Sequence, residues 1–228
     1  MLAIFNFKNK MSIATQEKLM DEFNTKNLNK NHQLIVAPIV PRKDSTYQFN
    51  VAIQNLAIKG RNVGDLSPQH LEHFGIKYAF VGHLERQSML NEDVTMIQSK
   101  IENAISHKVV PIACLGIQND VSKELREILA GLDLQNAEII FAYEILTATL
   151  RGQKDYSFTE IARNFTKLKD YLEGLSHEFS NFSYKLIFGG GIEKEHIEKV
   201  MHIGFDGVLV GDRIPALKSV YHYLESDV

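Results

Sequence analysis

Short apolar segments recur along this chain, and the longer stretches between them repeat apolar residues at every third or fourth position. The short segments are rich in Ile, Val, Leu and Phe and lack a clean alternation of apolar and polar residues. Such segments are typical of strands that are buried on both faces of a sheet. We predict eight strands, which begin at Leu2, Leu34, Phe49, Tyr78, Val109, Glu138, Tyr184 and Phe205.

The longer stretches predict helices between most of these strands. In residues 93–107 and 158–175, spacing of three or four positions places apolar residues on one helical face. In the first stretch these residues are Val94, Ile97, Ile101 and Ile105, and in the second they are Ile161, Phe165, Leu168 and Leu172. A repeated order of strand, helix and strand predicts an α/β fold with parallel strands and crossover helices.

Eight such units predict a closed (β/α)8 barrel, although 228 residues is slightly short of the typical length of about 250. Only "PRKDSTYQ" separates the second strand from the third, so the second crossover helix should be reduced or missing. A doubly wound open sheet is the alternative, but no Gly-x-Gly-x-x-Gly motif follows the first strand. Because no low-complexity linker divides the chain, we expect residues 1–228 to form a single domain.

Composition narrows the class of protein further. The net charge is −3, and Lys and Arg are scattered along the chain, which does not favour nucleic-acid binding. Cys114 is the only cysteine, no apolar run reaches the roughly 20 residues of a membrane helix, and the N-terminus lacks the basic region of a signal peptide. We therefore expect a cytoplasmic protein. His70 and His73 have a spacing that metals use, but no third ligand accompanies them, so we expect no metal.

Polar residues and glycines follow the ends of several predicted strands. In a (β/α)8 barrel the carboxyl ends of the strands meet at one mouth, where the loops carry the chemistry. We therefore expect these residues to converge on one site. They are Asn6, Lys8, Gln54, Asn55, His83, Glu85, Arg86, Glu144, Gly189, Gly190, Gly191, Gly211 and Asp212.

Five of these strand-end motifs resemble the triosephosphate isomerase family in order and spacing along nearly the whole chain. "NFK" at 6–8 resembles the family's Asn-Trp-Lys, and "GHLER" at 82–86 resembles Gly-His-Ser-Glu-Arg. "AYE" at 142–144 resembles the segment with the catalytic glutamate. "FGGGI" at 188–192 and "GVLVG" at 207–211 resemble the two phosphate-binding loops.

The resemblance implies a TIM barrel that interconverts glyceraldehyde 3-phosphate and dihydroxyacetone phosphate in glycolysis and gluconeogenesis, without metal or organic cofactor. It implies that Glu144 removes a carbon-bound proton, that His83 polarises the carbonyl, and that Lys8 and Asn6 stabilise the oxyanion. It also implies a homodimer and a small phosphorylated triose as substrate. The residues that it assigns to the phosphate are Gly190, Gly191, Gly211, Asp212 and Leu150. Glu85 and Arg86 would support Lys8 and the loop around it.

The chain also departs from the family pattern. "ILTATLRG" at 145–152 stands where the family has Pro-Val-Trp followed by Ala-Ile-Gly-Thr-Gly, so we expect closure of the lid to be altered. Leu84 replaces a serine that contacts the glutamate in the family, and Gly191 replaces another serine. Asp212 replaces a glycine, and its charge would repel a phosphate unless it points away or pairs with Arg213. Val63 replaces a threonine of the dimer loop.

These departures leave two alternative functions open. The chain could be an isomerase for a different small sugar or sugar phosphate, which is the alternative that Leu150, Gly191 and Asp212 favour. It could also be a catalytically weak barrel with a binding or scaffold role, although that hypothesis does not explain why Asn6, Lys8, His83 and Glu144 are all retained.

Overall fold

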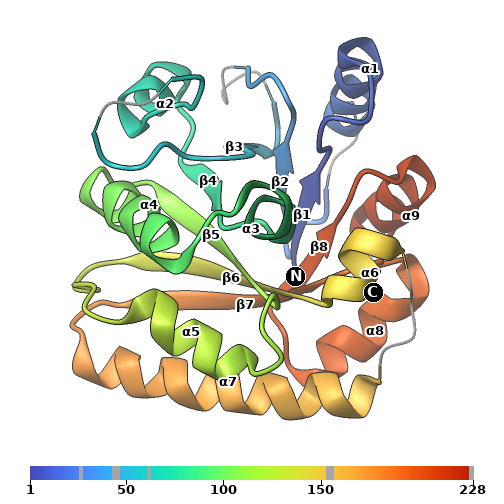
Figure 1. The fold of residues 1–228 in the computed structure, drawn as a ribbon. Helices are drawn as coiled ribbons and strands as arrows, with labels where there is room; N and C mark the ends of the chain where they lie inside the picture. The colour runs from blue at the N-terminus through green and yellow to red at the C-terminus, as the bar shows by residue number, and fades with distance from the viewer. Residues whose placement is uncertain (26–27, 43–46, 61–62, 153–156, 226–228) are drawn as a thin grey trace.

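All eight predicted strands are present in the computed structural model, where they close into a parallel barrel in chain order (Figure 1). The structure describes residues 1–25, 28–42, 47–60, 63–152 and 157–225. Strand β1 pairs with both β2 and β8, and this pairing closes the barrel. The strands are β1 (Leu2–Asn6), β2 (Gln33–Ala37), β3 (Asn50–Ile53), β4 (Tyr78–Val81), β5 (Val110–Leu115), β6 (Glu138–Glu144), β7 (Ser183–Gly189) and β8 (Gly207–Val210).

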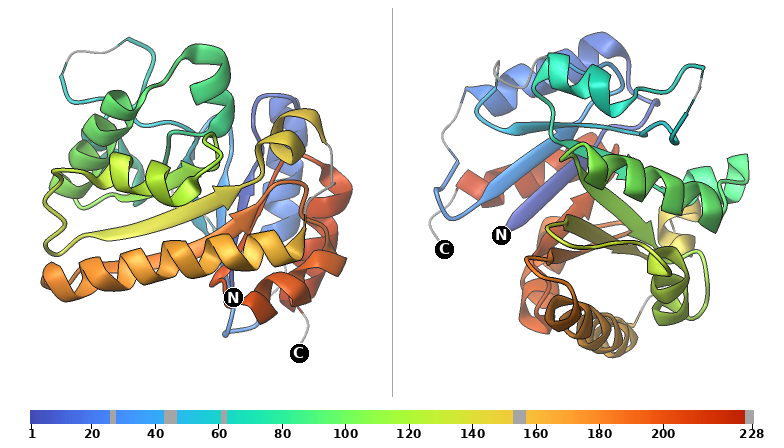
Figure 2. Two further views of the ribbon diagram at one scale, coloured as in Figure 1. Left: turned by 60° about the horizontal axis from the view of Figure 1, so that its bottom comes forward. Right: turned by 90° about the vertical axis from the view of Figure 1, so that its left-hand side faces the viewer.

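Helices surround the barrel, and Figure 2 shows the long helix α7 running beside the strands β6 and β7. The helices are α1 (Ile13–Asn24), α2 (Pro68–Phe74), α3 (Leu84–Leu90), α4 (Val94–Ser106), α5 (Val121–Leu129), α6 (Leu146–Arg151), α7 (Phe158–Glu178), α8 (Lys194–Ile203) and α9 (Ile214–Glu225). The described residues between β2 and β3 contain no helix, which agrees with the expectation that the second crossover helix is reduced or missing.

The two predicted amphipathic helices form where the periodicity placed them. Helix α4 begins after Asp93, whose side chain accepts a hydrogen bond from the backbone N–H of Met96 at 2.8 Å and caps the helix. Its residues Ile97 and Ile101 are fully buried against the barrel. Helix α7 buries Ile161, Phe165, Leu168 and Leu172 in the same way. The apolar spacing along these helices therefore fixes which face contacts the sheet.

The core has two layers, because successive side chains of a strand point to opposite faces. On β1, Leu2 and Ile4 belong to an apolar cluster inside the barrel, whereas Ala3 and Phe5 pack against the helices. The same alternation holds along β5, β6, β7 and β8. The interior cluster ends at the carboxyl ends of the strands, and at these ends the alternation points polar residues into the mouth of the barrel.

Candidate active site

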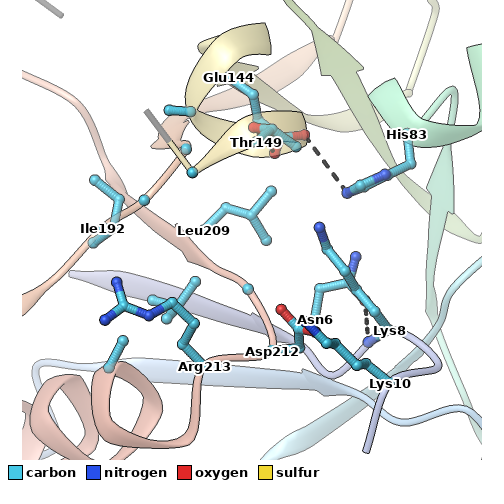
Figure 3. Close-up of a pocket in the computed structure, with 17 residues that line it drawn as sticks. Asn6, Lys8, Lys10, His83, Glu144, Thr149, Ile192, Leu209, Asp212 and Arg213 are labelled. Carbon is cyan, nitrogen blue, oxygen red and sulfur yellow. Dashed lines mark hydrogen bonds and ion pairs between the residues drawn. The ribbon is translucent and has the colours of Figure 1, made fainter. Parts of the chain in front are cut away.

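A cavity of about 230 Å³ opens at the carboxyl ends of the strands, a size suited to a small molecule (Figure 3). All four residues expected to be catalytic line it, together with four of the five residues expected to bind phosphate. The lining residues from the predicted site are Asn6, Lys8, His83, Glu144, Gly190, Gly191, Gly211 and Asp212. Leu150 lies on α6 and is not among the residues that line this cavity, so its assignment to the phosphate stays a prediction.

Glu144 points into the cavity because of its position on β6. It follows Ile140 and Ala142, which face the barrel interior, at the same period of two residues. On β7, Gly189 is the partner of Glu144 in the sheet register. A Cβ atom at Gly189 would come within 2.9 Å of Glu144 Cγ, so the glycine makes room for the carboxylate side chain.

The carboxylate of Glu144 is almost completely buried, with 4% of the residue exposed. Its Oε2 accepts a hydrogen bond of 3.0 Å from the hydroxyl of Thr149. Its Oε1 accepts no hydrogen bond from any described residue. Beneath it lies Cys114, and burial together with the nearby Glu144 carboxylate raises the pKa of that thiol well above its ordinary value. A buried carboxylate with one unpaired oxygen is chemically suited to accept a proton from a bound molecule.

His83 stands at the other side of the cavity as the N-cap residue of α3. Its Nδ1 accepts a hydrogen bond of 3.3 Å from the backbone N–H of Glu85. An acceptor nitrogen carries no proton, so the neutral ring has its proton on Nε2, the nitrogen that faces Glu144 in Figure 3. The distance from Nε2 to Oε1 of Glu144 is 3.8 Å, too long for a direct hydrogen bond, so both groups remain available to a substrate.

Asn6 is the last residue of β1, and Lys8 lies in the tightly held loop that follows it. Lys8 has φ of 50°, in the left-handed region that non-glycine residues rarely occupy. Asn6 Oδ1 accepts a hydrogen bond from Lys8 N at 3.1 Å, and Gln54 Nε2 donates to Lys8 O at 3.0 Å. The Lys8 ammonium contacts Glu85 Oε1 at 2.6 Å. This network fixes a positive charge beside His83 and Glu144.

Behind the His83 loop lies a buried ion network that sequence reasoning missed. Glu92 Oε1 accepts a hydrogen bond from Gly82 N at 3.0 Å, directly before His83. Glu92 Oε2 lies 2.6 Å from Arg86 Nε and 2.8 Å from Lys100 Nζ. Burial opposes the charge of Glu92, but hydrogen bonds from Lys100 and Arg86 outweigh it and lower its pKa. Burial also lowers the pKa of Lys100, although hydrogen bonding to Glu92 opposes this shift.

The other end of the cavity is formed by glycines and by charged residues of the loop after β8. Asp212 lines the cavity at this end. Arg213 also lines the cavity, but its Nη1 lies 2.5 Å from Glu193 Oε1. A pair between Asp212 and Arg213 is not among the ion pairs of the described residues, where Arg213 pairs with Glu193 instead. Lys10 lines the same cavity and adds another ammonium beside Asp212 (Figure 3).

Two residues that line the cavity, Lys10 and Thr149, were not predicted from the sequence. Lys10 lies two positions after Lys8 on the loop that follows β1, and this spacing could have indicated it. Thr149 lies five residues after Glu144, a separation whose meaning depends on the helical shape of α6. Glu92 and Lys100, which lie behind the His83 loop and not in the cavity, are charged residues, for which an exposed position is the usual expectation.

A second cavity adjoins the first on the far side of Lys8. Glu85 and Arg86 line it, together with Met89 and Leu90, whose apolar side chains are exposed.

Among the described residues, no group of three or more His, Cys, Asp or Glu could hold a metal ion. In the same part of the chain, no helix is long and apolar enough to cross a membrane.

Comparison with known proteins gives matches over nearly the whole chain. The family model described as triosephosphate isomerase matches residues 1–225. A triosephosphate isomerase from Dictyoglomus thermophilum is 27% identical over 246 residues, which cover 97% of this chain and 97% of the relative. Relatives of the same name from Thermoanaerobacter sp. (strain X514) and Orientia tsutsugamushi (strain Boryong) are each 27% identical. These matches cover 90% and 78% of this chain, and 91% and 74% of the two relatives.

Proposed function

The chain belongs to the triosephosphate isomerase family, and we propose that it interconverts D-glyceraldehyde 3-phosphate and dihydroxyacetone phosphate through an enediolate, in glycolysis and gluconeogenesis. The observation that carries the proposal is the placement of Asn6, Lys8, His83 and Glu144 around one cavity. The reaction moves a proton from one carbon to its neighbour and needs a base, an acid and a stabiliser of negative charge. These four side chains supply all three.

Glu144 is the base in this proposal. A proton on carbon next to a carbonyl is weakly acidic, so its removal needs a carboxylate that water does not solvate and a fixed donor at the carbonyl oxygen. Glu144 Oε1 is buried and unpaired among the described residues. The electrons of the broken carbon–hydrogen bond move to the carbonyl oxygen and give an enediolate. The same carboxylate then returns the proton to the neighbouring carbon.

His83 and Lys8 stabilise the enediolate. The Nε2–H of His83 donates to the developing oxyanion and transfers a proton between the two oxygens of the intermediate. The ammonium of Lys8, held 2.6 Å from Glu85, provides a fixed positive charge at the same place. Asn6 adds an amide to the wall of the cavity beside them. Fixed charges and dipoles of this kind need little rearrangement when the oxyanion forms.

The phosphate would lie at the glycine-rich end of the cavity. Gly190, Gly191 and Gly211 present backbone there with no side chain in the way, and Gly190 and Gly191 come shortly before α8. Backbone N–H groups before a helix of this length favour a bound anion. Lys10 adds positive charge to the same end, whereas the charge of Arg213 is balanced by Glu193.

A coupled assay with glyceraldehyde 3-phosphate tests the activity directly, and titration with phosphoglycolate tests the site. We expect turnover that phosphoglycolate inhibits competitively. A scaffold protein would fold normally and show neither turnover nor phosphoglycolate binding, so the two measurements together separate the enzyme from that alternative.

One observation favours a different small sugar phosphate as a second candidate substrate. Asp212 lines the cavity, and Arg213 is engaged by Glu193. A carboxylate in this place disfavours a nearby dianion and would accept hydrogen bonds from extra hydroxyl groups. A panel of aldose and ketose phosphates of three to six carbons, run with the wild type and Asp212→Gly, decides between the substrates. Higher kcat/KM for a longer sugar that is lost in Asp212→Gly would support the second candidate.

We further infer a cytoplasmic homodimer. Support for the dimer comes from the exposed apolar residues Met89 and Leu90 at the second cavity and from Val63, which is 99% exposed. Exposed apolar side chains of this kind are typical of a protein interface. Sedimentation equilibrium should give twice the mass of the chain, and Leu90→Arg should shift the protein towards the mass of a monomer. A wild-type monomer would contradict the inference.

A further inference from the structure

The hydroxyl of Thr149 donates a hydrogen bond to the buried carboxylate of Glu144, at 3.0 Å from Oε2. We propose that Thr149 is a positioning residue for the base, because its hydrogen bond holds Oε2 and leaves Oε1 facing the cavity and His83. This inference rests on the proposed function in one respect, namely that Glu144 is the base.

Because the Glu144 carboxylate is buried, the hydrogen bond from Thr149 should influence how the carboxylate is held. A carboxylate removed from water loses its hydration and needs donors from the protein. Leu84, which directly follows His83, places a fully buried apolar side chain in the cluster inside the barrel and offers no donor to Glu144. The hydroxyl of Thr149 supplies a donor to Oε2 of this carboxylate. With Oε2 held, the side chain has one oxygen free to accept a proton.

The backbone of α6 fixes where this hydroxyl lies. Thr149 N donates to Ile145 O at 2.9 Å, and Gly152 ends the helix with φ of 66° and a hydrogen bond to Ala148 O. Helix α6 also packs against α3, the helix that begins after His83. The donor is therefore held by the same structure that holds the acid and the base. Any rearrangement of α6 would move the donor and change the position of the base.

The hydrogen bond of the Thr149 hydroxyl differs from the one that a threonine usually makes within a helix. A threonine within a helix commonly bonds back to the carbonyl three or four residues earlier. Here Oγ1 donates to a side chain five residues earlier instead. The family pattern has isoleucine at this place in the lid segment, so the hydroxyl of Thr149 departs from that pattern. Thr147 lies on the same helix with an exposed side chain and provides a matched comparison.

Three variants test the proposal. Thr149→Val keeps the shape but removes the donor, Thr149→Ser keeps the donor, and Thr147→Val is the control on the same helix. For glyceraldehyde 3-phosphate, we expect kcat of Thr149→Val to fall by about tenfold or more, with KM little changed and the melting temperature lowered by only a few degrees. Thr149→Ser should stay within about threefold of the wild type, and Thr147→Val should match it. Wild-type kcat in Thr149→Val, or equal losses in the valine and serine variants, would overturn the proposal.

Infrared spectroscopy tests the role of Thr149 independently of the proposed function. Infrared difference spectra can identify the carboxylate stretch of Glu144 as the band that disappears in Glu144→Gln. Loss of a hydrogen bond should shift this band in Thr149→Val but not in Thr149→Ser or Thr147→Val. This measurement needs no turnover, so it holds even if the wild type does not isomerise triose phosphates. An unshifted band in Thr149→Val would overturn the inference whatever the activity.

Discussion

His83 Nε2 lies 3.8 Å from Glu144 Oε1, across a cavity at the mouth of the barrel. The imidazole comes from the cap of a short helix and the carboxylate from the last position of a strand, so two separate elements bring them together. Neither group uses the other as a hydrogen-bond partner at this distance. A proton donor and a proton acceptor therefore both face the space that a substrate would fill.

Glu85 is expected to matter through Lys8 rather than through direct contact with the substrate. The pair is separated by 2.6 Å, and a charged partner makes such a hydrogen bond stronger than a neutral one. Glu85→Gln should lower kcat/KM by about tenfold, because the ammonium loses its charged anchor. Glu102→Gln, which alters an exposed pair with Lys59 at 3.8 Å, serves as the control. Steady-state kinetics of both variants check this, and an unchanged kcat/KM in Glu85→Gln would contradict it.

The stability of the folded protein should depend on both partners of the buried ion pair between Glu92 and Lys100. Both residues are almost fully buried, and Lys100→Met would leave the carboxylate with fewer partners away from water. We expect the free energy of unfolding to fall by about 3–5 kcal/mol. Lys169→Met removes an exposed pair with Glu173 and should cost less than about 1 kcal/mol. Urea denaturation measures the change in unfolding free energy for each variant. Equal changes in the two variants would contradict a stabilising role of the buried pair.

The lowered pKa of Glu92 also predicts how the stability of the folded protein depends on pH. Its pKa in the folded protein is lowered from 4.5, so the ionised form stabilises the fold above that pH. This stabilisation is lost as the pH falls from about 4.5 through the lower pKa of the folded state. The free energy of unfolding should therefore fall with pH in this window, and less steeply in Glu92→Gln. Urea denaturation at several pH values from 3 to 7 checks this, and parallel curves for the two proteins would refute it.

Cys114 should be chemically inert in the folded protein. Its side chain is fully buried, and burial together with Glu144 raises the pKa of the thiol, so little reactive thiolate exists at neutral pH. A thiol reagent such as DTNB at pH 7.5 should not react with the native protein over minutes. After unfolding in urea it should react with one thiol per chain. Rapid reaction of the native protein would show that the thiol is accessible after all.

The fold could be predicted from the sequence because it depends on local periodicity. The period of two along β1 and β6 places Asn6 and Glu144 on the inner face, and the connection after β2 is too short for a full crossover helix. The direction of Asp212 could not be predicted in this way, because it depends on the path of a loop. The contact between Thr149 and Glu144 likewise requires the helical shape of α6, which residues 145–152 did not indicate.

Some predictions remain as they were made from the sequence. The role of Leu150 in phosphate binding and the extent of a single domain over residues 1–228 belong to this group. Phosphoglycolate binding by Leu150→Gly would test the first, since a shorter residue should allow closer approach of the backbone. Limited proteolysis would test the second, because one domain should give no stable fragments.

The most direct test of the central claim is a coupled assay of the wild type and Glu144→Gln with glyceraldehyde 3-phosphate. Glutamine keeps the shape of the buried side chain but cannot accept the proton from carbon. We expect rapid turnover by the wild type, almost complete loss of kcat in the variant, and similar melting temperatures and circular dichroism for both. Turnover that survives in a folded Glu144→Gln protein would contradict the assignment of Glu144 as the base.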